Sequence, residues 1–227
     1  MTFSPVRSMT LRDQVIEQIR TAIIEGRLRP GDHIVEASIT EQMQVSRTPV
    51  REALILLEQQ SLVVSYPNRG YFVQAFTEED VREIFSMRAN LENFAAELNI
   101  DRFTEDDYLT LEGMITRQKA AIETGDSKHV RSIDMGFHRY IVSFSRHSRL
   151  LRSWSELVAQ VAALLHLRAE GFEYDEMRAA EDHALIVDAY RARDLAAVMR
   201  HNNAINARVS GECQRAIQVL DARTKTG

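Results

Sequence analysis

The sequence has little of what extracellular and membrane proteins depend on. Cys213 is the single cysteine, so an intramolecular disulfide framework is excluded and a reducing compartment is favoured. No apolar run is long enough to cross a bilayer, and the first residues lack the basic-then-apolar order of a signal peptide. Only nine glycines and four prolines interrupt long stretches rich in Leu, Ile, Val, Ala, Glu and Arg. We therefore expect a cytoplasmic, mainly α-helical protein with no membrane partner.

Positive charge is also scarce. The whole chain carries a formal net charge of −5. Residues 1–75 contain eight arginines, no lysine and eight acidic residues, so the acidic excess lies entirely in the later part. A strongly basic domain is excluded, and any nucleic-acid surface has to come from local arginines such as Arg47, Arg51 and Arg69. Dimerisation would double such a surface, because each neutralised phosphate adds to affinity.

Residues 45–54 have the pattern of a DNA-recognition helix with its preceding turn. Ser46 or Thr48 can cap the helix, and Pro49 fits the first turn, where a missing N–H does no harm. Arg47, Thr48 and Arg51 lie at the helix N-terminus, the end that a helix-turn-helix presents to the major groove. Arginine there can bind phosphate or the O6/N7 edge of guanine. Apolar residues recur at helical spacing and predict a buried face: Val50, Ala53, Leu54 and Leu57.

The neighbouring segments predict a winged helix-turn-helix domain over residues 1–76. Helices are expected at 11–25, 36–44 and 48–60. Two β-prone segments, 62–66 and 71–76, flank Pro67-Asn68-Arg69-Gly70 and predict a hairpin wing. Strand patterns are missing from residues 77–227, where we expect an all-α bundle of about six helices: 78–99, 104–124, 127–146, 148–170, 175–192 and 194–221.

Four polar residues of the predicted bundle have the types expected of a metal site. Asp134 and His138 are four residues apart, so they share one helix face, and their apolar neighbours indicate that this face is partly buried. A buried carboxylate and imidazole either satisfy each other or bind a ligand. Together with His183 and His201 they would make a reasonable set of ligands for a divalent transition metal such as Zn, Ni or Mn. A metal-free polar pocket and a self-satisfied Asp–His pair are the alternatives.

Arg88 lies beside the apolar stripe of the predicted helix 78–99, with Glu92 one turn further on. The two residues can form an i,i+4 ion pair worth about 0.2–0.5 kcal/mol. Alternatively, Arg88 points into a pocket and grips the carboxylate of an effector with its planar guanidinium.

Three motifs of the first 75 residues resemble the winged-helix signature of GntR-type bacterial transcription regulators. They are Gly26-Arg27-Leu28-Arg29-Pro30-Gly31, Ser46-Arg47-Thr48-Pro49-Val50-Arg51-Glu52-Ala53-Leu54 and Pro67-Asn68-Arg69-Gly70. The second half is similar to the helical FCD-type effector domain of the FadR branch. The residues that carry this second resemblance are Arg88 with Glu92, Asp134 with Phe137-His138, Asp182-His183 and Arg193-Asp194. Six C-terminal helices resemble the VanR-type subgroup.

The resemblance implies roles for the residues of the winged helix. Arg47, Thr48 and Arg51 would contact DNA, and the wing tip at Asn68-Arg69-Gly70 would reach the adjacent groove or the backbone. Ser46 would either bind a phosphate or only cap the helix.

The chain departs from the family pattern in three places. Gln44 and Ser61 replace glycines, so Gln44 is expected to take a left-handed backbone conformation at modest cost. The last metal-binding histidine of the family falls at the position of Ile205, whereas His201 lies one helical turn earlier. A shifted helix could still bring His201 to the metal. Otherwise a neighbouring asparagine or a water would replace it, or the site has three protein ligands.

The resemblance implies a ligand-responsive transcription regulator, most simply a repressor, that binds a palindromic operator as a homodimer. In the resembled branch an Asp/His metal helps to hold a small carboxylate, which implies a small organic acid as effector, bound near Arg88. Residues 77–227 would bind this effector and dimerise. An enzyme in which the metal activates water is an alternative, although no further base or nucleophile is placed to assist it. A regulator with a metal-free effector pocket, or with a purely structural metal, is another.

Overall fold

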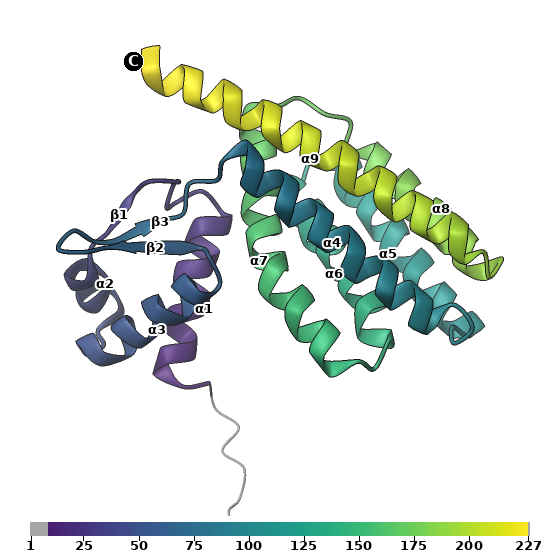
Figure 1. The fold of residues 1–227 in the computed structure, drawn as a ribbon, viewed down its shortest axis with the longest axis horizontal. Coiled ribbons are helices and arrows are strands. Elements are labelled where there is room, and N and C mark those ends of the chain that lie inside the picture. Colours follow the sequence, from purple (N-terminus) through teal and green to yellow (C-terminus); the bar gives the residue numbers. More distant parts are fainter. Residues whose placement is uncertain (1–8, 227) are drawn as a thin grey trace, which may run out of the picture. The chain divides into compact units, whose positions relative to one another are not determined.

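The computed structural model describes residues 9–226, with side chains described up to residue 223. The chain divides into two compact units, one up to Ala75 and one from Phe76 onward (Figure 1). Among the described residues, no helix combines the length and the apolar character of a membrane span.

From residue 9 onward, the first unit consists of three helices and a small sheet. The helices are α1 (Leu11–Ile24), α2 (Glu36–Met43) and α3 (Arg47–Gln59), and the strands are β1 (His33–Ile34), β2 (Val63–Tyr66) and β3 (Gly70–Val73). The strands pair antiparallel in the order β1-β3-β2. The predicted three helices and hairpin are confirmed. The sequence did not predict β1, because two residues are too few to show a strand periodicity.

Three residues other than glycine adopt a left-handed backbone in the described part of this unit: Gln44, Ser61 and Asn68, which lies in the wing. Gln44 ends α2 with φ 53° and ψ 41°, and Ser61 follows α3 with φ 53°. The left-handed conformation expected for Gln44 is therefore confirmed. Each residue accepts a steric cost of about 1–2 kcal/mol, which the surrounding contacts offset.

Up to residue 226, where the description ends, the second unit is a bundle of six helices, as predicted. They are α4 (Glu78–Asn99), α5 (Glu105–Glu123), α6 (Ser127–Phe144), α7 (Ser148–Gly171), α8 (Met177–Arg191) and α9 (Leu195–Thr226). The Thr77 backbone N–H donates to Asp80 Oδ2 at 2.7 Å, and the Asp80 N–H donates to Thr77 Oγ1 at 3.1 Å, so a capping box starts α4. Helices α4 and α9 pack side by side (Figure 1), and α4 also contacts α6 and α7.

The core of this unit holds the single tryptophan and the single cysteine. Trp154 is 1 % exposed and packs with Ala95, Val142 and Leu150. Cys213 is fully buried, and burial raises the pKa of its thiol to about 12. The Cys213 thiol is therefore shielded from solvent and is protonated at pH 7.

Candidate metal centre and nucleic-acid interface

The N-terminus of α3 presents its polar residues to solvent. Ser46 occupies the capping position with an extended backbone, but its side chain makes no capping hydrogen bond. Ser46, Arg47 and Thr48 are exposed. The Arg51 side chain is 61 % exposed, and its Nε donates to Glu36 Oε2 on α2 at 2.8 Å. This ion pair could not be predicted from the sequence, because the two residues come from different helices.

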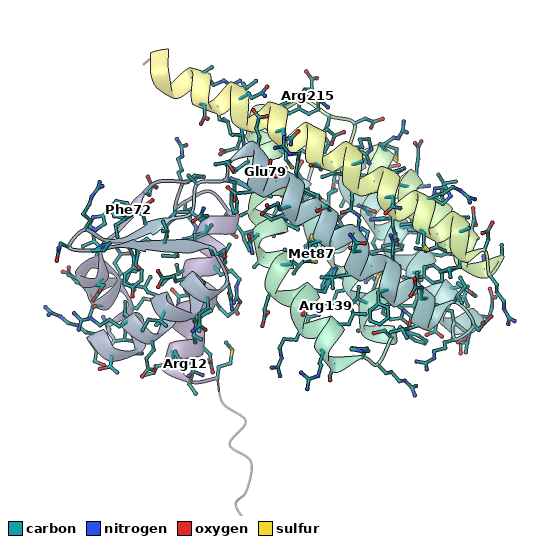
Figure 2. The ribbon with its side chains drawn as sticks, viewed as in Figure 1. Arg12, Phe72, Glu79, Met87, Arg139 and Arg215 are labelled. Atoms are coloured by element: carbon teal, nitrogen blue, oxygen red, sulfur yellow. The ribbon has the colours of Figure 1, made fainter. Side chains whose placement is uncertain are left out.

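The wing is a tight hairpin whose tip carries one arginine. Tyr66 pairs with Gly70, and the tip contains Asn68 at φ 61° and Gly70 at φ 84°. The Arg69 guanidinium lies over the Tyr66 and Phe72 rings, 5.8 and 5.5 Å from their centroids (Phe72 is labelled in Figure 2). Asn68, Arg69 and Gly70 are all exposed. The structure thus leaves every residue predicted to contact DNA accessible.

Three of the four predicted metal ligands lie together in the second unit. Asp134 and His138 come from α6 and His183 comes from α8, and one ligand atom of each lies within 4.8 Å of the others. His183 Nε2 is 3.2 Å from His138 Nε2 and 3.3 Å from Asp134 Oδ1. Both histidines are buried, whereas the Asp134 side chain is 17 % exposed.

The other ring nitrogen of each histidine faces a buried acceptor. His138 Nδ1 is 3.2 Å from Glu92 Oε1 on α4. His183 Nδ1 is 2.9 Å from Gln118 Oε1 on α5. Metal-binding histidines commonly donate their second N–H to such acceptors, which orients the ring and fixes the tautomer. Sequence reasoning found neither acceptor in this role.

Arg88 forms the ion pair with Glu92 that the sequence allowed, but both groups are buried. Arg88 Nε donates to Glu92 Oε1 at 2.8 Å, and both side chains are 3 % exposed. Glu92 also accepts from Trp154 Nε1 at 3.2 Å and from Asn206 Nδ2 at 3.3 Å. Arg88 Nη2 is buried and has no hydrogen-bond partner among the described residues. One donor of the guanidinium is therefore still available to a ligand.

The charges of this network shift several pKa values. Burial would raise the pKa of the Glu92 carboxyl, but the interactions with Arg88 and His138 together outweigh it and hold this pKa well below its usual range. Burial would also raise the pKa of the Asp134 carboxyl, but the interactions with His183, His138 and Arg88 together outweigh it and lower this pKa. Burial lowers the pKa of His183, against the opposing effect of Asp134. The two carboxylates are therefore ionised and His183 is neutral at pH 7.

His201 is the predicted ligand that the structure does not bring to this group. It lies on α9, is partly exposed and is not among the clustered residues of the described chain. The physical reason is the rotation of α9. Asn202 and Asn206 face inward and donate to Asn93 and Glu92, at 3.1 and 3.3 Å, and Ile205 is buried. Among the described residues, the structure therefore brings together three of the four predicted ligands, Asp134, His138 and His183.

A winged helix-turn-helix followed by a helical bundle with a buried polar centre defines a DNA-binding transcriptional regulator with a helical regulatory domain. Comparison with known families gives the same class. Residues 11–73 match the family of bacterial regulatory proteins named gntR, and residues 83–207 match the FCD domain. The chain belongs to the GntR family of transcriptional regulators and to its branch with an FCD domain.

Individual relatives are regulators as well. The chain is 32 % identical over 188 residues to the Probable D-xylose utilization operon transcriptional repressor of Paenarthrobacter nicotinovorans, covering 82 % of this chain and 80 % of that one. It is 30 % identical over 183 residues to the gluconate operon transcriptional repressor of Bacillus licheniformis, covering 78 % and 74 %. The solved structure of Escherichia coli McbR/YncC has the same fold, with a TM-score of 0.75, 23 % identity and coverage of 96 % and 100 %. Both operon repressors are regulators of transcription, the class to which this chain belongs.

Proposed function

We propose that this regulator is an effector-responsive repressor that binds a palindromic operator as a homodimer. Its first unit would read DNA through Ser46, Arg47, Thr48 and Arg51 of the recognition helix and Asn68-Arg69-Gly70 of the wing. Its second unit would hold a divalent transition metal through Asp134, His138 and His183, and a small carboxylate effector beside it. Effector binding would change operator affinity by favouring one arrangement of the dimer over another.

The observation that carries the proposal is the convergence of three acceptor atoms at one point. If His138 and His183 each donate their Nδ1–H to Glu92 and Gln118, both Nε2 atoms carry lone pairs directed at each other. Asp134 Oδ1 adds a third lone-pair donor 3.3 Å from His183 Nε2. Three acceptors in contact repel one another, and a cation between them removes this repulsion. Two imidazoles and one carboxylate suit Zn, Ni or Mn and leave positions for an external ligand.

The carboxylate effector is supported by Arg88 and by the relatives. Arg88 Nη2 is a buried donor without a partner among the described residues, so it can donate a hydrogen bond to an oxygen of a ligand. A metal ion would supply a second positive charge for the same carboxylate to contact. One relative at 30 % identity is a gluconate operon repressor, and gluconate is a hydroxylated carboxylate. We therefore place sugar-derived acids first among effectors to be tested.

The DNA-binding part of the proposal is tested by exchanging one arginine at a time. We expect Arg51→Ala to abolish binding to the chain's own operator in a gel shift at fixed salt, without unfolding the protein. Arg12→Ala is the matched control, because Arg12 is also exposed and paired with an acid, Asp13, but lies on α1 outside the proposed interface (Figure 2). Unchanged affinity of Arg51→Ala, or an equal loss in Arg12→Ala, would contradict the proposed interface.

The metal is tested on untagged protein that has been treated with chelator. Titration with Zn²⁺, Ni²⁺ or Mn²⁺ should raise the melting temperature and saturate at one ion per chain. His183→Ala should lose this response, whereas His201→Ala should keep it, because His201 lies outside the group. No stabilisation of the wild-type chain by any of the three ions would refute the metal centre.

The effector is tested by repeating the operator gel shift with small carboxylates, with and without metal. We expect sugar acids to change operator affinity only in metal-loaded protein, and Arg88→Met to abolish the response. A full response in chelated protein would instead support a metal-free effector pocket. A metal-dependent melting shift without any response to carboxylates would indicate a structural metal.

A further inference from the structure

Glu92 lies behind the proposed metal centre and takes no direct part in it. Its side chain is 3 % exposed and touches groups from four helices: Arg88 on its own α4, His138 on α6, Trp154 on α7 and Asn206 on α9. Arg88, Trp154 and Asn206 present N–H groups that can only donate. A carboxylate surrounded by such donors acts as an acceptor on both oxygens.

We propose that Glu92 is a positioning residue that fixes the tautomer of the metal ligand His138. This inference rests on the proposed metal centre. An ionised carboxylate has no proton to give, so the contact of 3.2 Å between Glu92 Oε1 and His138 Nδ1 requires a proton on Nδ1. The lone pair of a neutral ring is then on Nε2, the atom that faces Asp134 and His183. The ring is therefore set for metal binding before the ion arrives.

The second histidine lacks such an anchor. Its neighbour Gln118 has one acceptor and one donor group at the end of its side chain, so the amide can serve either tautomer of His183 by turning over. Gln118 is fully buried, and its Nε2 has no hydrogen-bond partner among the described residues, so nothing there holds the amide in one orientation. The two histidines are thus held differently: the carboxylate fixes His138, and the amide adapts to His183.

The experiment compares two variants that differ only at residue 92. Arg88→Met keeps the carboxylate, and the double variant Arg88→Met/Glu92→Met removes it together with its charged partner. The double variant removes both charges of the buried ion pair, so neither Arg88 nor Glu92 is left as an unpaired charge. Histidine-labelled protein is treated with chelator, and ¹⁵N NMR of the imidazoles reports which ring nitrogen of His138 carries the proton. Zn²⁺ affinity is then measured by competition with a chelating dye.

In wild type and in Arg88→Met we expect the proton of His138 on Nδ1. In the double variant it should move to Nε2, where His183 Nε2 lies 3.2 Å away and can accept it. Zn²⁺ affinity should fall about 10–100-fold relative to Arg88→Met, the usual effect of removing such an outer partner. Gln118→Met is a further control, because it removes the acceptor of the other histidine and should leave the His138 tautomer unchanged.

The outcomes separate this inference from the proposed metal centre. If wild-type protein binds no metal, the metal centre is wrong, but the NMR comparison on metal-free protein still decides the role of Glu92. If wild type binds Zn²⁺ and the double variant keeps both the Nδ1 proton and the affinity of Arg88→Met, Glu92 is only the partner of a buried ion pair. If Arg88→Met does not fold, the double variant is compared with wild type and Gln118→Met by the same two measurements.

Discussion

Removing Glu92 from the buried Arg88–Glu92 pair should destabilise the protein more than removing Arg88. Both side chains are 3 % exposed, and Nε and Oε1 are 2.8 Å apart. Glu92→Met leaves a buried guanidinium with neither its Nε partner nor one for Nη2. Arg88→Met leaves a carboxylate that still has three neighbours, His138, Trp154 and Asn206. Unpairing a buried charge costs about 3–5 kcal/mol, so we expect Glu92→Met near the upper end and Arg88→Met near the lower end.

The double variant provides the quantitative test. If the two sites were independent, the single costs would add to about 6–10 kcal/mol. Replacing both charges with methionine leaves an apolar pair of similar volume, which is often close to neutral for a buried ion pair. Trp154 and Asn206 lose an acceptor, at about 1–3 kcal/mol each. We therefore expect the double variant to be no less stable than Glu92→Met alone. Its loss of unfolding free energy should be several kcal/mol smaller than the sum of the two single losses.

Urea denaturation of chelator-treated protein at pH 7, followed by tryptophan fluorescence, measures these energies. Trp154 is the only tryptophan and is buried in the second unit, so its emission reports this unit separately from the first. Its contact with Glu92 makes separate folded baselines necessary for each variant. Two results would refute the assigned network: losses of unfolding free energy that add in the double variant, or a larger loss for Arg88→Met than for Glu92→Met.

Three further predictions concern stability. Gln44→Gly should stabilise the first unit by up to about 1 kcal/mol, because glycine removes the strain at φ 53°, as thermal melts by circular dichroism would show. Gly70→Ala should lower stability by about 1–2 kcal/mol, since φ is 84° and a Cβ would lie 3.1 Å from His33 Nε2; Gly113→Ala, in an open helical position, should instead gain up to about 1 kcal/mol. Metal-free protein should lose stability as pH falls through about 6.5, because the pKa of His183 is lowered in the folded chain and the unfolded chain therefore binds a proton on this residue first. The contribution of His183 is at most about 1.4 kcal/mol per pH unit, and His183→Gln should flatten this slope in urea titrations at several pH values.

The parts of the structure that follow from short stretches of sequence could be predicted. Apolar residues at helical spacing predicted the buried face of α3, and the β-prone segments on either side of the wing tip predicted the hairpin. The left-handed backbone of Gln44 was expected from the resemblance, which has glycine at this position. The pairing of Asp134 with His138 also follows from helical spacing. Contacts between side chains of different helices could not be predicted, because they depend on how the helices pack.

Two outcomes at the metal centre illustrate this limit. Glu92 and His138 are 46 residues apart in sequence, and only the packing of α4 on α6 brings them to 3.2 Å. His201 was expected at the site from its residue type, but the rotation of α9 directs Asn202 and Asn206 inward instead. A difference of one position along a helix turns a side chain by about 100°, so residue type alone does not select the inward face.

The burial of Cys213 has a practical consequence for measuring motion. Its thiol is inaccessible and its pKa is raised to about 12, so maleimide dyes at neutral pH should leave it unmodified. A cysteine introduced at an exposed position of each unit can therefore be labelled without first replacing the native one. Fluorescence energy transfer between the two dyes would then follow the separation of the units as metal, carboxylate and operator DNA are added in turn.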